Sequence, residues 1–243
     1  MEQIIKKLRD DKHYYGEFGK QYLSASDVGT LLTNPKAFKS DSEKTKAMIE
    51  GSYMHALILE PDTVDDRFEI VDCSSRGTKK YKEIALEVKD KDLLLKGEAE
   101  NMEECANAIL KNFEVYNLIR GNGTVVEEPA IKKLFGNWWK GKRDIGNEFT
   151  VDIKTTSDIS KFRQSAYRYN YDSQAWVYKQ LFDAPVIFVP VDKITHQVGI
   201  ITCSDEFLDR GMQKVIQATD VYNKYFGDNA TEDINNFLIR ESL

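Results

Sequence analysis

The chain has 243 residues, of which 41% are hydrophobic and 30% charged, and its formal net charge is −6. This composition is that of a globular protein with one substantial core, and it argues against a protein that coats DNA by bulk positive charge. No apolar run approaches the roughly 18 residues that a membrane span needs, and the N-terminal residues lack the apolar region of a signal peptide. We therefore expect a cytoplasmic protein with no membrane partner.

The N-terminal half of the sequence has the character of a helical region. Residues 23–40 predict a helix that is capped by Ser24 or Ser26 and stopped at Asn34-Pro35. Residues 44–61 predict a second helix, and a short strand follows in DRFEIVD. Residues 78–120 are charged, and their apolar positions recur at helical spacing.

The pattern changes after residue 120. VVEEPAI, the segment around NWWKGKRDI, and EFTVDIKTT predict three strands with turns at Gly136-Asn137 and Gly146-Asn147. A helix beginning at Ser157, two strands and an amphipathic C-terminal helix complete the chain. We therefore predict an α/β (α+β) fold in one domain over residues 1–243. Its parts would be a helical region to about 120, a sheet over about 121–205 and a C-terminal helix over about 205–243.

The stretch VDIKTT, residues 151–156, combines an apolar strand with two opposite charges. Because side chains two apart on a strand point to the same face, Asp152 and Lys154 project together. A hairpin would bring Asp144 from the preceding strand beside Asp152. Two neighbouring carboxylates repel each other unless a cation lies between them, and such oxygen ligands suit Mg²⁺. A surface ion pair is the alternative reading of Asp152 and Lys154 taken alone.

Positive charge is concentrated around these residues. Between Lys132 and Arg168 there are nine basic and four acidic residues, which gives +5 in a chain of −6. Such an asymmetry is typical of a site that binds an anion.

The order of these residues resembles a known superfamily. Asp144 followed by Asp152-Ile153-Lys154 is similar to the PD-(D/E)XK nuclease pattern, although Arg143 stands where the pattern has proline. Gly51 and His55 resemble the G-x-x-x-H helix of the RecB-like branch, and Gln174 with Tyr178 resembles its Q-x-x-x-Y element. The run LSASDVGTLLTNPKAF resembles phage and prophage exonucleases of the exonuclease VIII and lambda types. The resemblance implies a restriction-endonuclease-like core with a central mixed sheet flanked by helices.

The resemblance also implies roles for individual residues. His55, Asp144 and Asp152 would bind the metal together with the Ile153 carbonyl, and Lys154 would position or activate the attacking water. Glu128 would be a further carboxylate near the metal. The residues expected to contact DNA are Gln174, Tyr178, Ser26 near a 5′-phosphate, Arg163 and Arg168.

The function implied by the resemblance is that of a metal-dependent 5′→3′ exonuclease. It would use one or two Mg²⁺ ions, for which Mn²⁺ can substitute, and it would degrade linear double-stranded DNA to leave 3′ single strands for recombination. The implied partners are DNA ends, a single-strand annealing protein and further copies of the chain in a trimer or tetramer.

Other functions remain open from the sequence. A RecB-like nuclease of the CRISPR-adaptation type would carry four cysteines around an iron–sulfur cluster, whereas Cys73, Cys105 and Cys203 are three scattered residues. A non-catalytic domain that binds DNA ends and a sequence-specific endonuclease are the remaining alternatives.

Overall fold

The computed structural model describes residues 1–41 and 43–238. Its centre is a five-stranded sheet in the order β3-β4-β5-β6-β7, in which β5 and β6 are parallel and the other neighbours are antiparallel. The strands are β3 (Val125–Leu134), β4 (Asn137–Gly146), β5 (Thr150–Thr156), β6 (Val186–Asp192) and β7 (Ile201–Thr202). The predicted central mixed sheet flanked by helices is thereby confirmed.

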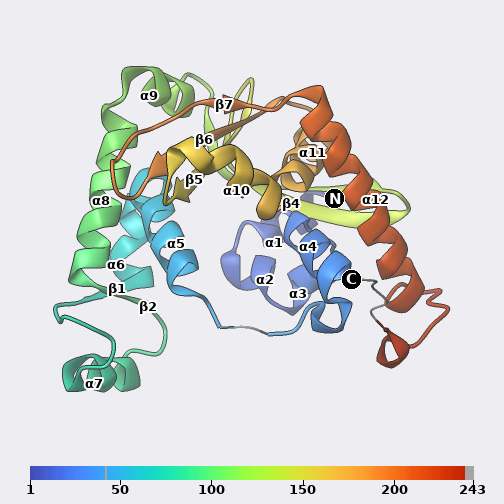
Figure 1. The fold of residues 1–243 in the computed structure, drawn as a ribbon, viewed down its shortest axis with the longest axis horizontal. Helices are drawn as coiled ribbons and strands as arrows, with labels where there is room; N and C mark the ends of the chain where they lie inside the picture. The colour runs from blue at the N-terminus through green and yellow to red at the C-terminus, as the bar shows by residue number, and fades with distance from the viewer. Residues whose placement is uncertain (42, 239–243) are drawn as a thin grey trace.

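Helices cover both faces of this sheet (Figure 1). One face packs against α5 (Lys46–Leu59), α8 (Lys96–Lys111) and α9 (Phe113–Arg120). The other face packs against α4 (Ala25–Thr33), α10 (Phe162–Arg168), α11 (Tyr171–Phe182) and α12 (Asp205–Tyr225). Apolar side chains line both interfaces, so the sheet lies between two hydrophobic cores.

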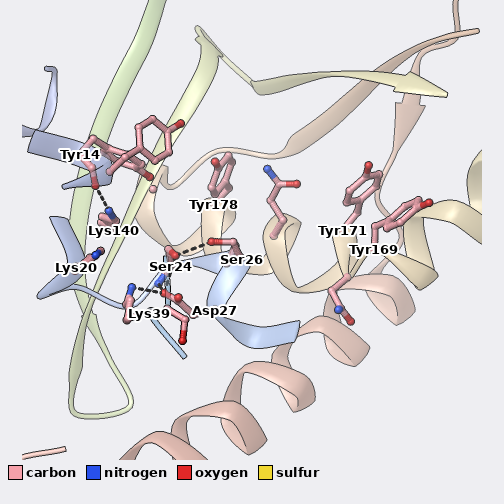
Figure 2. Close-up of a pocket in the computed structure, with 16 residues that line it drawn as sticks. Tyr14, Lys20, Ser24, Ser26, Asp27, Lys39, Lys140, Tyr169, Tyr171 and Tyr178 are labelled. Carbon is pink, nitrogen blue, oxygen red and sulfur yellow. Dashed lines mark hydrogen bonds and ion pairs between the residues drawn. The ribbon is translucent and has the colours of Figure 1, made fainter. Parts of the chain in front are cut away.

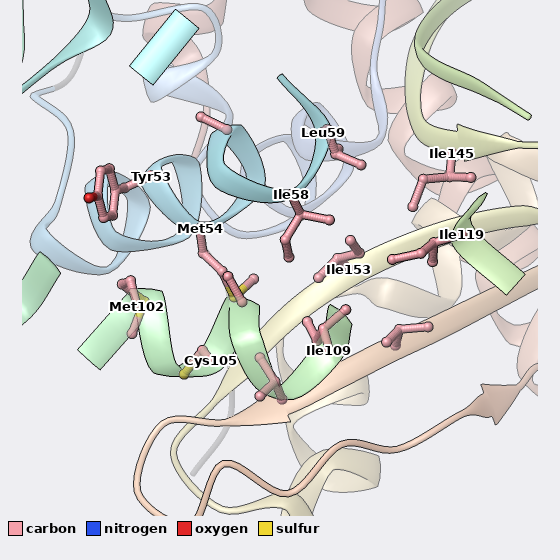
Figure 3. Close-up of a cluster of buried hydrophobic side chains, with 14 of the residues drawn as sticks. Tyr53, Met54, Ile58, Leu59, Met102, Cys105, Ile109, Ile119, Ile145 and Ile153 are labelled. Carbon is pink, nitrogen blue, oxygen red and sulfur yellow. The ribbon is translucent and has the colours of Figure 1, made fainter. Parts of the chain in front are cut away.

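The first core fixes the position of α5 above the central strands. Met54 and Ile58 of α5 are fully buried beside Ile109 of α8 and Ile153 of β5 (Figure 3). Burial of such side chains contributes roughly 1.5–3 kcal/mol each relative to exposure. The polar residues of α5 that face the strand edge are thus held at a defined place.

The β3–β4 hairpin has a register set by its two-residue turn. Phe135 and Gly136 both have positive φ angles, of 47° and 86°, which is the backbone of a type I′ turn. Leu134 pairs with Asn137, and the same register continues to Val125 opposite Gly146.

Further elements surround this layered centre. Three short helices, α1 (Glu2–Leu8), α2 (Asp11–Tyr15) and α3 (Glu17–Lys20), lie between α5 and α4 in the view of Figure 1. A small parallel sheet joins β1 (Phe68–Val71) to β2 (Asp92–Leu95), with α6 (Val64–Arg67) before it and α7 (Lys79–Glu87) between its strands. Strand β2 lies in a stretch that was expected to be helical, because a short apolar run such as DLLL has no period that distinguishes the two structures.

Two helices differ from their expected extents. The helix expected after Ser157 is divided at Asn170, whose φ of 58° is left-handed and is tolerated by asparagine. The C-terminal helix ends at Tyr225, and residues 239–243 of the expected helix lie outside the described residues. Among the residues that the structure describes, no helix has the length and apolar character that crossing a membrane would need.

Candidate active site

Strand β5 separates its charged residues from its apolar ones, as its alternating sequence predicts. Val151 and Ile153 are fully buried in the core beneath α5 and α8. Asp152 and Lys154 point to the other side, where α11 supplies Gln174 and Tyr171 to the same cavity of about 430 Å³. Asp152 is only 2% exposed, so the pair is not a solvated surface ion pair.

Asp144 lies where β4 and β5 separate. The ladder between these strands consists of Gly146 with Thr150 and Ile145 with Val151. At the next step the Asp144 carboxylate accepts a hydrogen bond of 2.8 Å from the Ile153 backbone N–H. The side chain therefore replaces a strand-to-strand bond, and the two strands diverge to form the cavity.

His55 reaches this cavity from α5. Its Nε2 lies 2.8 Å from the Ile153 carbonyl oxygen, and because a carbonyl only accepts, Nε2 carries the hydrogen. In the neutral ring the lone pair of Nδ1 is then free, and Nδ1 lies 3.5 Å from an oxygen of Asp144. The expected meeting of His55 with Asp144 therefore occurs, although 89 residues separate them in the chain.

The carboxylate that completes this group is Glu127, and the expectation for Glu128 is corrected. Glu128 pairs with Arg143 at 2.5 Å and lines a different hollow of the surface. Glu127 points to the opposite face, as strand alternation requires, and the register places it opposite Asp144. Its φ of 48° is unusual for a residue other than glycine, and such backbone strain is concentrated at functional sites.

His55, Glu127 and Asp144 form a group that fits a cation. One ligand atom from each residue lies within 4.8 Å of the others. Burial, followed by repulsion from Asp144, raises the pKa of Glu127 to about 8. A divalent cation would relieve this repulsion, and one imidazole nitrogen with two carboxylates is a donor set that such ions accept.

Asp152 and Lys154 form a buried ion pair beside that group. Burial raises the pKa of Asp152 to about 6 against the opposing effect of Lys154. Burial also acts to lower the pKa of Lys154, but Asp152 and Asp144 outweigh it and the pKa is raised. Lys154 is therefore a cation at neutral pH, and its Nζ also lies 5.0 Å from the centre of the Tyr171 ring.

The two residues of the Q-x-x-x-Y element contact the site in different ways. Gln174 donates a hydrogen bond of 2.7 Å to Oδ1 of Asp152, whereas Lys154 pairs with Oδ2 of the same carboxylate. Tyr178 is buried and donates its hydroxyl to the Lys142 carbonyl at 2.8 Å. Neither side chain bonds to Lys154 directly.

A second cavity, of about 570 Å³, adjoins the first (Figure 2). Tyr14, Tyr15, Tyr171, Gln174 and Tyr178 line both cavities. The charged residues that line the second cavity are Lys20, Lys39, Lys140 and Asp27.

The structure separates the remaining residues expected to contact DNA. Ser26 lines the second cavity, and its hydroxyl lies 3.0 Å from that of Ser24, which caps α4. Arg163 and Arg168 are exposed outside these two cavities, and the Arg168 guanidinium lies 5.8 Å from the Tyr169 ring. Ser26 thus lines the neighbouring cavity, whereas the two arginines lie at the surface outside both cavities.

Comparison with known proteins relates this site to a family. The sequence profile of a family described as "PDDEXK-like domain of unknown function (DUF3799)" matches residues 27–231. The structure of a "Putative exonuclease" from Eubacterium rectale has a TM-score of 0.66 at 18% identity, covering 96% of this chain and 95% of that chain. A phage related exonuclease from Haemophilus somnus 129PT has a TM-score of 0.36 at 16% identity, covering 84% and 94% respectively. No curated protein matches the chain. The Eubacterium rectale similarity shows a shared fold.

Proposed function

The chain belongs to the PDDEXK-like family, and we propose that it is a metal-dependent nuclease, specifically a 5′→3′ exonuclease on linear double-stranded DNA. One observation supports this proposal above all. His55, Glu127 and Asp144 gather within reach of one cation, and the buried Asp152–Lys154 pair lines the same cavity. This is the arrangement that hydrolysis of a phosphodiester by a metal-activated water requires.

The metal would be held by His55, Glu127 and Asp144, with Asp152 as the further carboxylate of the motif. A bound Mg²⁺, or Mn²⁺ in its place, would supply a Lewis acid for the phosphate and lower the pKa of a bound water. We propose one or two such ions.

Lys154 would act on the water and on the phosphate as a fixed positive charge. Because its pKa is raised, its ammonium group donates hydrogen bonds and does not accept a proton. It would orient the nucleophile by donation and stabilise the charge that develops on the phosphate oxygens. Asp152 holds Lys154 in place through the ion pair, and Gln174 holds Asp152 through the 2.7 Å hydrogen bond.

The second cavity supports the proposal that the enzyme works from a strand end. It adjoins the catalytic cavity, and three lysines and one aspartate supply its charged side chains. A terminal phosphate on the 5′ side of the cleaved bond would compete for these lysines with the carboxylates that pair with Lys20 and Lys39, and Ser26 would be available to donate a hydrogen bond. Hydrolysis would release products with a 5′-phosphate, and phosphate contacts would position the DNA without reading its sequence.

The biological setting is part of the proposal. We propose a cytoplasmic enzyme that acts on DNA ends as a homo-oligomer, a trimer or tetramer. The 3′ single strands that it leaves would pass to a single-strand annealing protein for recombination. No base-reading element is needed for such a role.

End-labelled linear duplex, incubated with the protein and Mg²⁺, tests this function. The native protein is expected to release mononucleotides, whereas Lys154→Ala and Asp152→Ala release none, and excess EDTA stops the reaction. Activity that persists in Lys154→Ala would contradict the mechanism, and activity that survives EDTA would contradict the metal requirement.

A further inference from the structure

The walls of both cavities include a segment that the family profile does not cover. The profile begins at residue 27, but Asp11, Tyr14 and Tyr15 line the catalytic cavity. Lys20 and Ser24 of the same segment line the second cavity. The substrate path of this chain is therefore bounded by residues that precede the shared domain.

This segment fills the gap that opens between β4 and β5. The Leu23 N–H donates to the Trp138 carbonyl at 2.9 Å, and the Lys140 N–H donates to the Leu23 carbonyl at 2.7 Å. Leu23 thus pairs with β4 beyond the point where β5 has separated from it. The segment is in this way a structural part of the sheet edge at the site.

Side chains fasten the segment to the same strand. Lys142 bonds to Asp11 at 2.5 Å, and Lys140 donates to the Tyr14 carbonyl. Tyr14 is buried, and a Cβ on Gly19 would overlap the Tyr14 carbonyl, so the turn between α2 and α3 is closely packed. A wall held in this way does not yield readily to an incoming strand.

The wall lies at one end of the second cavity. In Figure 2, Tyr14, Lys20 and Lys39 gather at one end and Tyr169 with Tyr171 at the other. A strand that ran from the catalytic carboxylates into this cavity would pass Tyr14 and Tyr15, which line both cavities, and would then meet Lys20 and Ser24 of the segment. A continuous polynucleotide would need a way through this wall, whereas a strand that ends inside the cavity would not.

We propose that residues 11–24 form an end stop, which makes cleavage depend on a free strand end. This inference rests on the proposed nuclease function and assigns its exonuclease character to a particular segment. The end stop would contact the terminal nucleotide of a DNA strand. Two residues would then make the enzyme an exonuclease and not an endonuclease. One is Asp11, which fastens the segment, and the other is the exposed Tyr15, which lines both cavities.

The end stop is tested by comparing duplex DNA that has free ends with duplex DNA that has none. A linear duplex is compared with a dumbbell of the same sequence, in which hairpin loops close both ends, in the presence of Mg²⁺. The native protein is expected to cleave the dumbbell at least 100-fold more slowly than the linear form. Equal rates on the two substrates would overturn the end stop and the exonuclease specificity, while leaving metal-dependent nuclease activity intact.

A double variant, Asp11→Ala with Tyr15→Ala, tests the segment itself. The side chain of Asp11 is 48% exposed and Tyr15 is 69% exposed, and neither belongs to the two hydrophobic cores, so the double variant is expected to fold. The ratio of dumbbell to linear cleavage is expected to rise at least tenfold, whereas Lys12→Ala on the exposed side of α2 leaves it unchanged. An unchanged ratio in the double variant would overturn the role of these residues. Absence of metal-dependent cleavage of every substrate would instead refute the proposed function, and the stop with it.

Discussion

Glu127 lies opposite Asp144 on the neighbouring strand, and the two carboxylates share one small space with the imidazole of His55. Glu128, the next residue along β3, is on the other face and pairs with Arg143. Two adjacent glutamates therefore lie in different environments, so the same substitution at each of them gives a matched pair of variants.

Glu127→Gln is expected to weaken Mn²⁺ binding by at least about tenfold and to lower nuclease activity with it, because one charged ligand of the cation is lost. Glu128→Gln is expected to leave binding unchanged and to lower the free energy of unfolding by about 1 kcal/mol, because it weakens the bond to Arg143. Calorimetric titration of Mn²⁺ and chemical denaturation measure the two effects. Equal loss of Mn²⁺ affinity in both variants would contradict the assignment of Glu127.

The raised pKa of Glu127 makes the stability of the metal-free protein depend on pH. Burial and Asp144 move this pKa from 4.5 to about 8, so between these values the folded protein holds a proton that the unfolded chain has lost. The free energy of unfolding therefore falls as the pH rises through this interval. Thermal melting from pH 5 to 8 is expected to show the fall in the native protein and a smaller one in Glu127→Gln.

Added Mg²⁺ should reverse this trend, because binding requires the ionised carboxylate and releases its proton. The rise in melting temperature on adding Mg²⁺ is expected to be larger at pH 8 than at pH 6. A larger rise at pH 6 would show that Glu127 is not a ligand.

Gln174 tests whether the Asp152 carboxylate must be held for catalysis. Gln174→Glu replaces the donor at 2.7 Å with an acceptor of like charge, which raises the pKa of Asp152 further. We expect kcat to fall about 10–100-fold and the acid limb of the pH–rate profile to move to higher pH, with KM little changed. Gln180→Glu, on the same helix, is the control. A change in KM alone would indicate that Gln174 binds DNA and does not position Asp152.

Asp172 connects the helix that carries Gln174 to the C-terminal helix. It is fully buried, and Lys214 of α12 bonds to it at 2.8 Å and to Asn170 at 2.8 Å. Lys214→Met is expected to lower the free energy of unfolding by about 3 kcal/mol, because it leaves the buried Asp172 carboxylate with only the longer ion pair to Arg210, at 3.4 Å. Lys224→Met removes an exposed pair on the same helix and should cost less than about 1 kcal/mol. Urea denaturation measures the free energy of unfolding of both variants. A similar decrease in Lys214→Met and Lys224→Met would contradict the importance of the buried pair.

Local pattern was sufficient to predict much of the fold and part of the site. The alternation in VDIKTT placed Asp152 and Lys154 on one face, and the spacing of Gly51 and His55 indicated the helix from which the imidazole comes. The turn lies at Phe135-Gly136, one residue before the predicted Gly136-Asn137, and only the observed turn pairs 134 with 137 and, by counting outward, 127 with 144. The expectation for Glu128 came from the resemblance, and a shift of one residue on a strand reverses the face to which the side chain points.

Other parts of the site depend on contacts that no local pattern encodes. The pairing of Leu23 with β4 arises because β5 diverges there, and the bond from Lys214 to Asp172 joins elements 42 residues apart. Strand β2 was missed because its partner, β1, lies across a helix and not in a hairpin. These features follow from tertiary packing, so they become visible only in three dimensions.

The bridge between Leu23 and Trp139 also bears on how the molecule reaches its native state. During synthesis the N-terminal segment leaves the ribosome first, yet the backbone groups that it bonds to belong to a hairpin made more than a hundred residues later. Closing so long a loop costs entropy before any contact repays it, and contacts of this kind slow folding. Assembly of the pocket walls must therefore wait for the hairpin, and a partly made chain cannot display a finished catalytic cleft.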